Sequence, residues 1–121
     1  MDKEQALHSF WSGFTIPAYD ENTVKETAAL PYITYNVVTD SLGSNVAMSA
    51  SLWYRSTSWT DITAKSNEIA ASIGRDGRRI PYNGGVLWIK RGVPFAQRMS
   101  DEDDTIRRIY INIEAEYISA D

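Results

Sequence analysis

Two stretches of the chain place apolar residues at the spacing of an amphipathic helix. The first covers residues 2–14 and is expected to end near Gly13. Its apolar stripe consists of Leu7, Phe10, Trp11 and Phe14. The second is expected to begin at a cap on Thr60 or Asp61 and to stop at Gly74, because glycine favours helix ends. Its narrower stripe consists of Ile62, Ile69, Ala70 and Ile73.

Alternation of apolar and polar residues predicts two strands in the first half of the chain. Residues 32–38 alternate with a period of two, and residues 46–55 show the clearest alternation in the sequence. The turn formers at positions 40–45 lie between them, so a hairpin is expected. Residues 15–30 contain a proline and several turn formers, which indicates an extended connection.

The second half of the chain predicts three more strands. Residues 86–91 and 95–99 are short candidates, and Gly-Val-Pro at 92–94 has the spacing of a tight hairpin connection. The acidic run at 101–104 is expected to be a solvated turn. A long final strand alternates charged and amide residues with Ile109, Ile111, Ile113, Ala115 and Tyr117, which are expected to face the core.

These elements predict one α+β domain over residues 1–121. Their order is α-β-β-α-β-β-β. Consecutive strands joined by short turns favour antiparallel pairing, and two amphipathic helices can cover one face of such a sheet. The expected architecture is a two-layer sandwich, with a mostly antiparallel sheet and both helices on one face.

Composition excludes several kinds of chemistry. The 121 residues include no cysteine and a single histidine, His8, so thiol catalysis, thiolate metal sites and multi-histidine sites are excluded. The formal net charge of −4 argues against a surface that is basic throughout. The longest apolar runs fall far short of the ~20 residues that span a bilayer, and no signal-peptide pattern opens the chain, so a cytosolic product without a membrane partner is expected.

No motif in the sequence supports a catalytic, cofactor-binding or metal-ligating residue. The acidic run lacks the alternating ligands and central glycine of a calcium loop. The glycine-rich stretches at 74–77 and 83–85 lack the lysine and hydroxyl that complete a phosphate loop. His8 lies near the apolar stripe of the first helix, without a local nucleophile or acid pattern. We therefore expect no enzyme activity and no cofactor.

The aromatic residues give a stronger indication of function. Four tryptophans and seven tyrosines exceed what a core of this size requires, so some are expected to be exposed. Trp53 shares a strand face with Arg55, and Trp59 lies just before the second helix. Exposed aromatics beside arginine are typical of protein interfaces, although a covering local loop explains a tryptophan equally well. Trp53, Arg55 and Trp59 are therefore candidate subunit-interface residues.

A second candidate is the segment 75–85, which is rich in glycine and proline and is expected to be a mobile loop. Its candidate interface residues are Arg75, Arg78, Arg79 and Tyr82. Together with Trp88, Lys90 and Arg91, they also resemble a nucleic-acid patch. An interface loop, an ordinary solvated loop and a nucleic-acid-binding module all remain open for this segment.

The order of segments resembles small tail terminator or tail completion proteins of long-tailed bacteriophages, particularly those of Gram-positive hosts. The resemblance spans nearly the whole chain and is carried by residues 16–20 (IPAYD), 30–35 (LPYITY), 50–54 (ASLWY), 66–69 (SNEI) and 108–114 (RIYINIE). None of these segments is a catalytic fingerprint.

The resemblance implies a virion structural subunit, made in the host cytoplasm. It would form a homo-oligomeric ring, commonly a hexamer, that caps the tail tube and joins it to the head connector. The expected partners are a tail tube protein and a head-completion protein, with no specific nucleic acid. A neighbouring head-tail joining protein of similar size fits equally well. The alternatives from other classes are a nucleic-acid-binding module using the Arg75 to Arg91 segment, and an enzyme whose site arises only from tertiary proximity.

Overall fold

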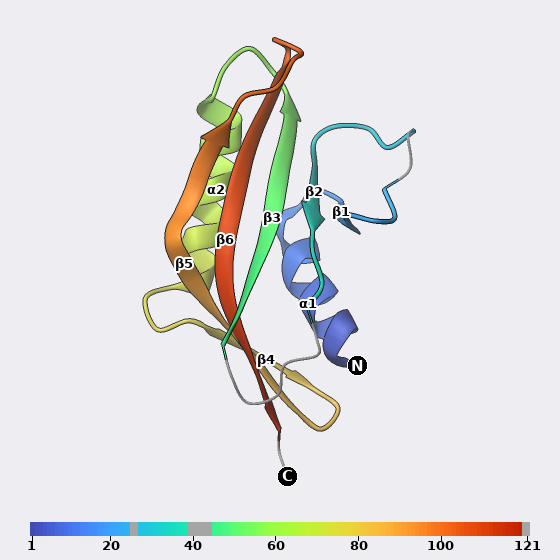
Figure 1. Ribbon diagram of the computed structural model, residues 1–121, viewed down its shortest axis with the longest axis vertical. Helices are drawn as coiled ribbons and strands as arrows, with labels where there is room; N and C mark the ends of the chain where they lie inside the picture. Colours follow the sequence, from blue (N-terminus) through green and yellow to red (C-terminus); the bar gives the residue numbers. More distant parts are fainter. Residues whose placement is uncertain (25–26, 39–44, 120–121) are drawn as a thin grey trace.

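A computed structural model describes residues 1–24, 27–38 and 45–119. In chain order the elements are α1 (Lys3–Trp11), a short 3₁₀ helix (Ser12–Phe14), β1 (Ala18–Asp20), β2 (Tyr32–Tyr35), β3 (Val46–Arg55), α2 (Thr60–Ile73), β4 (Arg78–Tyr82), β5 (Gly85–Met99) and β6 (Ile106–Ser119). The strands form one six-stranded sheet in the order β1-β2-β3-β6-β5-β4 (Figure 1). The α+β class is confirmed, whereas the predicted element order is wrong.

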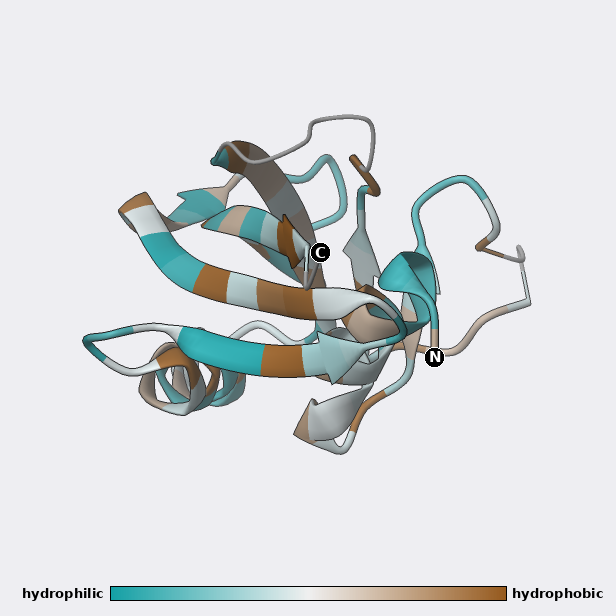
Figure 2. Ribbon diagram, turned by 90° about the horizontal axis from the view of Figure 1, so that it is seen from below, coloured by the Kyte–Doolittle hydropathy of each residue, from teal (hydrophilic) through white to brown (hydrophobic). Residues whose placement is uncertain are grey.

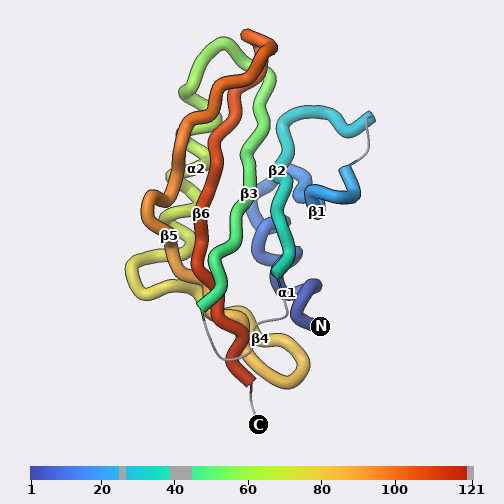
Figure 3. The backbone as a smooth tube through the Cα atoms, in the orientation of Figure 1, coloured from blue at the N-terminus to red at the C-terminus, as the bar shows by residue number. Residues whose placement is uncertain are grey.

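The sheet is curled. Helix α2 packs against β3, β5 and β6, and lies behind them in Figure 1. Helix α1 contacts β1 and β4, which are the two edge strands of the sheet. The smooth trace in Figure 3 shows how β4 crosses beneath α1 while β1 and β2 lie at its side. The sheet thus wraps around α1, and the predicted two-layer sandwich is not confirmed.

The longest strands agree with the predicted alternation. Ten consecutive residues of β3 pair antiparallel with β6. Along β6, the residues at alternate positions are buried and form the centre of the core: Ile109, Ile111, Ile113, Ala115 and Tyr117. The apolar stripes of both helices belong to the same core cluster. The alternation along the strands is visible as bands of colour in Figure 2. The predicted core face of β6 is confirmed.

Both helices lie close to their predicted positions. Asp2 caps α1 through a hydrogen bond from the Gln5 amide, and the Gln5 side chain bonds back to the Asp2 amide. Helix α2 stops at Gly74, whose φ of 74° suits a residue without a side chain. The predicted cap of α2 is wrong: the N-cap residue is Trp59, and the Ser58 hydroxyl accepts a hydrogen bond from the Thr60 amide at 3.1 Å.

Three short-range predictions are wrong. The extended connection contains β1, which pairs in parallel with β2. The supposed mobile loop contains β4, which pairs with the first five residues of β5. The two short strands at 86–91 and 95–99 are one continuous strand, in which Arg91 and Ala96 border an irregularity in the pairing with β6. Most of the predicted turn at 40–45 lies outside the described residues.

The irregularity in β5 has a clear cause at Gly92. This glycine is buried against β6, and a Cβ atom there would lie 2.8 Å from the Asn112 carbonyl oxygen. The Asn112 side-chain amide donates a hydrogen bond to the Pro94 carbonyl at 2.9 Å. The chain therefore bows away from the sheet for a few residues and then resumes pairing, as in a β-bulge. We call residues 92–94 the knuckle.

Candidate interaction surfaces

The sheet face opposite the core carries two rows of polar and aromatic side chains. Backbone register sets the rows, because directly paired residues of neighbouring strands point to the same face. One row consists of Tyr32, Trp53, Arg108 and Met99, and the next consists of Tyr19, Thr34, Ser51, Tyr110 and Gln97. Helix α2 lies behind β3, β5 and β6 in Figure 1, so the opposite face of these strands is turned toward the viewer and no described helix covers it there.

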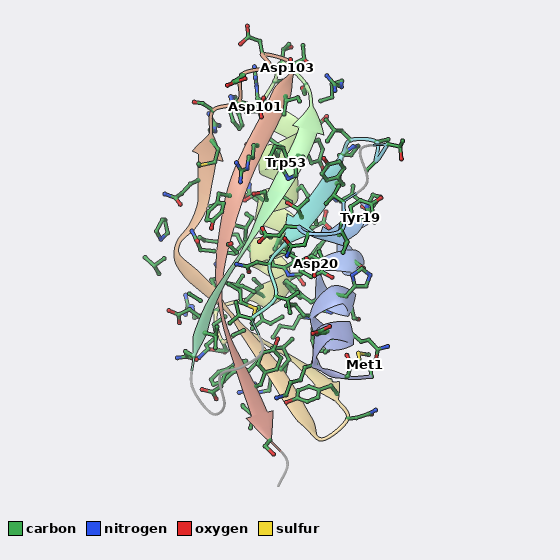
Figure 4. The ribbon with its side chains drawn as sticks, turned by 45° about the vertical axis from the view of Figure 1, so that its right-hand side comes forward. Met1, Tyr19, Asp20, Trp53, Asp101 and Asp103 are labelled. Atoms are coloured by element: carbon green, nitrogen blue, oxygen red, sulfur yellow. The ribbon has the colours of Figure 1, made fainter. Side chains whose placement is uncertain are left out.

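Trp53 is the centre of this surface and is half-buried. Its indole Nε1 donates a hydrogen bond to the Thr34 hydroxyl at 2.9 Å. The Arg108 guanidinium lies over its ring, 4.6 Å from the centroid, and the Tyr32 ring is 6.5 Å away. The indole is therefore held in one orientation by contacts within its own chain. Tyr19, which pairs with Thr34, belongs to the same sheet face as Trp53, and both are labelled in Figure 4.

A hollow of about 440 Å³ opens beside Trp53 on this face. We call it the sheet-face hollow. It is lined by side chains of β2, β3 and β6 and of the segment that follows β1, chiefly Glu21, Tyr32, Thr34, Ser49, Trp53 and Tyr110. The Arg108 guanidinium and the Asn36 amide also line it, so the hollow offers ring surface together with hydroxyl groups, one carboxylate and one cation. Such a mixed lining can contact a small side chain and bond to the backbone beside it.

Arg55 extends the same face of β3 to the end of the sheet. Its guanidinium donates to the Thr105 hydroxyl at 2.9 Å and lies 3.7 Å from an Asp103 oxygen, with 61% of the side chain exposed. Hydrogen bonds from Thr105, with a smaller contribution from Arg55, hold the pKa of Asp103 below its usual value. In Figure 4 Asp101 and Asp103 mark this end of the molecule. The acidic run is a turn braced by hydrogen bonds.

Trp59 does not join this surface. It lies between two guanidinium groups, at 4.7 Å from Arg98 and 5.3 Å from Arg107. Arg98 pairs with Ile109, and Arg107 pairs with Tyr54. Both arginines therefore belong to the sheet face that carries the core, at the end of that face where the buried residues stop. The three candidate interface residues therefore lie on two different faces, with Trp53 and Arg55 together and Trp59 apart.

The four candidate loop residues are also separated. Arg78, Arg79 and Tyr82 belong to β4, whereas Arg75 is exposed before it. Arg78 donates to the Ser72 hydroxyl at 2.6 Å. The Tyr82 ring packs edge-on against Tyr117, 6.1 Å between centroids. Of these four residues, Arg79 lies beside a basic residue outside the set, because Arg79 and Lys90 both contact the ring of Trp88.

Trp88 is held by two cations. The Arg79 guanidinium and the Lys90 ammonium lie 4.6 Å and 4.4 Å from its ring centroid. Its Nε1 donates to the Asp76 carbonyl at 3.1 Å. Glu116 pairs with Trp88 across the sheet, and Glu114 pairs with Lys90. Acidic residues thus accompany the basic ones on this face.

His8 lies on the exposed side of α1. One ring nitrogen is 2.8 Å from the Tyr35 hydroxyl and the other is 3.0 Å from the Ser12 hydroxyl. Burial, and then the nearby carboxylates of Asp20 and Glu4, raise the pKa of Tyr35. The phenol is therefore protonated at neutral pH. This chain of hydrogen bonds joins α1 to β2.

The most exposed large apolar residue in the described part of the chain is one that the sequence did not indicate as functional. Val93, in the knuckle, has 97% of its surface exposed. Its neighbours are fixed, because Gly92 is buried against β6 and Asn112 holds the Pro94 carbonyl. The motif Gly-Val-Pro was interpreted as a hairpin turn.

Comparison with known proteins gives a likeness of fold. A chain in the solved virion of a native gene transfer agent particle superposes with a TM-score of 0.59 at 17% sequence identity, covering 97% of this chain and 95% of that chain. The chain matches no family model and no curated protein sequence. Within the described residues, no helix has the length and apolar character needed to cross a membrane, and no cluster of three or more acidic or histidine side chains could hold a metal ion.

Proposed function

We propose that this chain is a structural subunit of a phage-type virion that assembles with copies of itself into a ring, caps the tail tube and joins it to the head connector. The observation that carries the proposal is the likeness of fold, over nearly the whole of both chains, to a chain of a gene transfer agent virion. Such a protein acts by stoichiometric assembly, so its important residues lie on surfaces that meet other chains.

The outer sheet face supports self-assembly. An uncovered face with aromatic and arginine side chains has the composition of protein interfaces. Trp53 is already fixed by Thr34 and Arg108, so little conformational entropy is lost when a partner covers it. A ring requires two different patches that meet repeatedly around an axis. We assign one patch to this face, including Trp53 and Arg55.

The polar side chains support a structural role over a catalytic one. His8 bridges two elements, and the acidic turn at 101–104 is braced by its own hydrogen bonds. No enzyme activity is proposed. The nucleic-acid alternative has less support, because the ring of Trp88 already carries two cations and Glu114 and Glu116 lie on the same face. A base would have to displace Arg79 or Lys90 in order to stack on Trp88.

The test combines particle mass with tail morphology. Purified chain is measured by light scattering and electron microscopy, and lysates that lack the chain are complemented with variants. Arg55→Ala removes an exposed side chain and should leave the fold intact while weakening the ring. Glu102→Ala, in the neighbouring turn, is the matched control. Loss of uniform, head-joined tails in the Arg55→Ala lysate supports the proposal. A parent chain that stays monomeric, even with purified tail tubes, refutes it.

A further inference from the structure

We propose that the knuckle of one copy seats in the sheet-face hollow of the next copy, with Val93 as the inserted side chain. The inference rests on the self-assembly proposed above and identifies the two patches that meet. Its starting point is the fixed exposure of Val93. Val93 is 97% exposed, and the Asn112 side chain holds the backbone beside it by a hydrogen bond to the Pro94 carbonyl. The valine side chain is therefore held on the surface, where another chain can contact it.

The hollow suits this occupant. Its volume of about 440 Å³ accommodates a small apolar side chain together with its flanking backbone. The lining is mixed: Tyr32, Trp53 and Tyr110 supply ring surface, and Thr34, Ser49 and Arg108 supply polar groups. Backbone groups of the knuckle can bond to these polar groups while Val93 contacts the rings. Aromatic pockets that receive one protruding side chain are typical centres of protein interfaces.

The knuckle and the hollow lie toward opposite sides of the sheet. β4 pairs only with residues 85–89, so β5 from Lys90 onward borders no other described strand on that side. The hollow lies across the sheet, among β2, β3 and β6. Figure 1 shows β5 and β2 on opposite sides of β6 and β3. Two unlike patches on opposite sides produce a head-to-tail contact, which is the kind that closes into a ring.

Charge favours the same pairing. Strand β5 carries Lys90, Arg91 and Arg98 and no acidic residue. The described residues 18–24, on the hollow side of the sheet, carry Asp20 and Glu21 and no basic residue. A head-to-tail arrangement brings the basic strand of one copy to the acidic segment of the next. Two knuckles facing each other would instead bring cations together, which disfavours a symmetric dimer.

The absence of cysteine from the chain makes a crosslinking test direct. Val93→Cys is combined with Ser49→Cys, because Ser49 lines the hollow and cysteine is close to serine in size. Oxidation of the assembled double variant should produce a ladder of covalent multimers in a denaturing gel. A mixture of the two single variants should stop at the crosslinked pair. Val93→Cys with Ser9→Cys, an exposed position on α1, is the control and should give no ladder.

The outcomes separate this inference from the proposed function. If light scattering shows oligomers but the double variant gives no ladder, the knuckle contact is wrong and self-assembly stands. Dimers from Val93→Cys alone would indicate a symmetric contact and overturn the inference. A chain that remains monomeric across a concentration series contradicts self-assembly, and the knuckle contact falls with it.

A second variant tests the contact without crosslinks. Val93→Asp changes a side chain outside the core, so the melting temperature should match that of the parent. The concentration needed for half-assembly should rise by about tenfold or more. Ile118→Asp, at another exposed apolar residue, is the control and should change assembly little. Equal assembly of the Val93→Asp variant and its parent would overturn the proposed contact.

Discussion

Ile111 lies in the most sensitive row of the core. It is fully buried on β6, and its paired neighbours are Ala50 on β3 and Ala96 on β5. Because both neighbours are small, no adjacent strand side chain can move into space left at this position. Ile111→Ala removes three carbon groups, each contributing roughly 0.8 kcal/mol. The resulting cavity adds to this loss, so we expect about 4 kcal/mol of destabilisation, toward the upper end of measured isoleucine-to-alanine changes.

Urea denaturation followed by circular dichroism measures the effect. The midpoint should fall while the slope stays unchanged, since the same surface is exposed on unfolding. Glu114→Ala, at an exposed position on the same strand, is the control and should change stability by less than about 0.5 kcal/mol. Ile111→Asp should unfold the domain, because it buries an unpaired carboxylate. A loss below about 1 kcal/mol for Ile111→Ala would refute the packing described for this row.

Three further predictions concern other parts of the molecule. The Tyr117 hydroxyl is buried with no hydrogen-bond partner among the described residues, so Tyr117→Phe should preserve or increase thermal stability. Burial, and then Tyr82 and Glu4, raise the pKa of Tyr117 to about 12. Because the phenol ionises less readily in the folded chain than in the unfolded chain, where its pKa is near 10, the free energy of unfolding should fall as pH rises from about 10 to about 12. An alkaline titration followed by phenolate absorbance should show a component near pH 12, which Tyr117→Phe removes. A Cβ atom on Gly85 would clash with the Ile118 carbonyl oxygen, so Gly85→Ala should lower the melting temperature, whereas Gly13→Ala, which meets nothing nearby, should change it much less. Retention on DNA should be weak and nearly independent of salt, whereas steep salt dependence would favour the nucleic-acid alternative.

Periodicity predicted the long elements because each buries one side over many residues. β3, β6 and α2 follow their alternation or stripe closely. The short strand β1 could not be predicted, since three residues are too few to show a period and its pairing partner in β2 is distant in sequence. β4 was mistaken for a loop because it contains Pro81. Proline is tolerated in that strand because it lies at the sheet edge, where fewer backbone donors are needed.

Glycine and proline also caused the error in β5. Gly92 and Pro94 indicate a hairpin by composition, but Gly92 is required here for close approach to the Asn112 backbone. The candidate surface was predictable only in part. The alternation of β3 places Trp53 and Arg55 on one face, as the structure has them. The hollow beside Trp53 depends on β2, β6 and the segment after β1 coming together, and no local pattern encodes that arrangement.

The mass of the purified chain in solution is the most direct test of the central proposal. Light scattering combined with electron microscopy across a concentration series should show a closed ring of one size, commonly a hexamer in the family that the sequence resembles. Glu102→Ala should form the same particle, and Arg55→Ala should form it less readily. A chain that remains monomeric at every concentration, and also in the presence of purified tail tubes, would contradict the assignment as a ring-forming virion subunit.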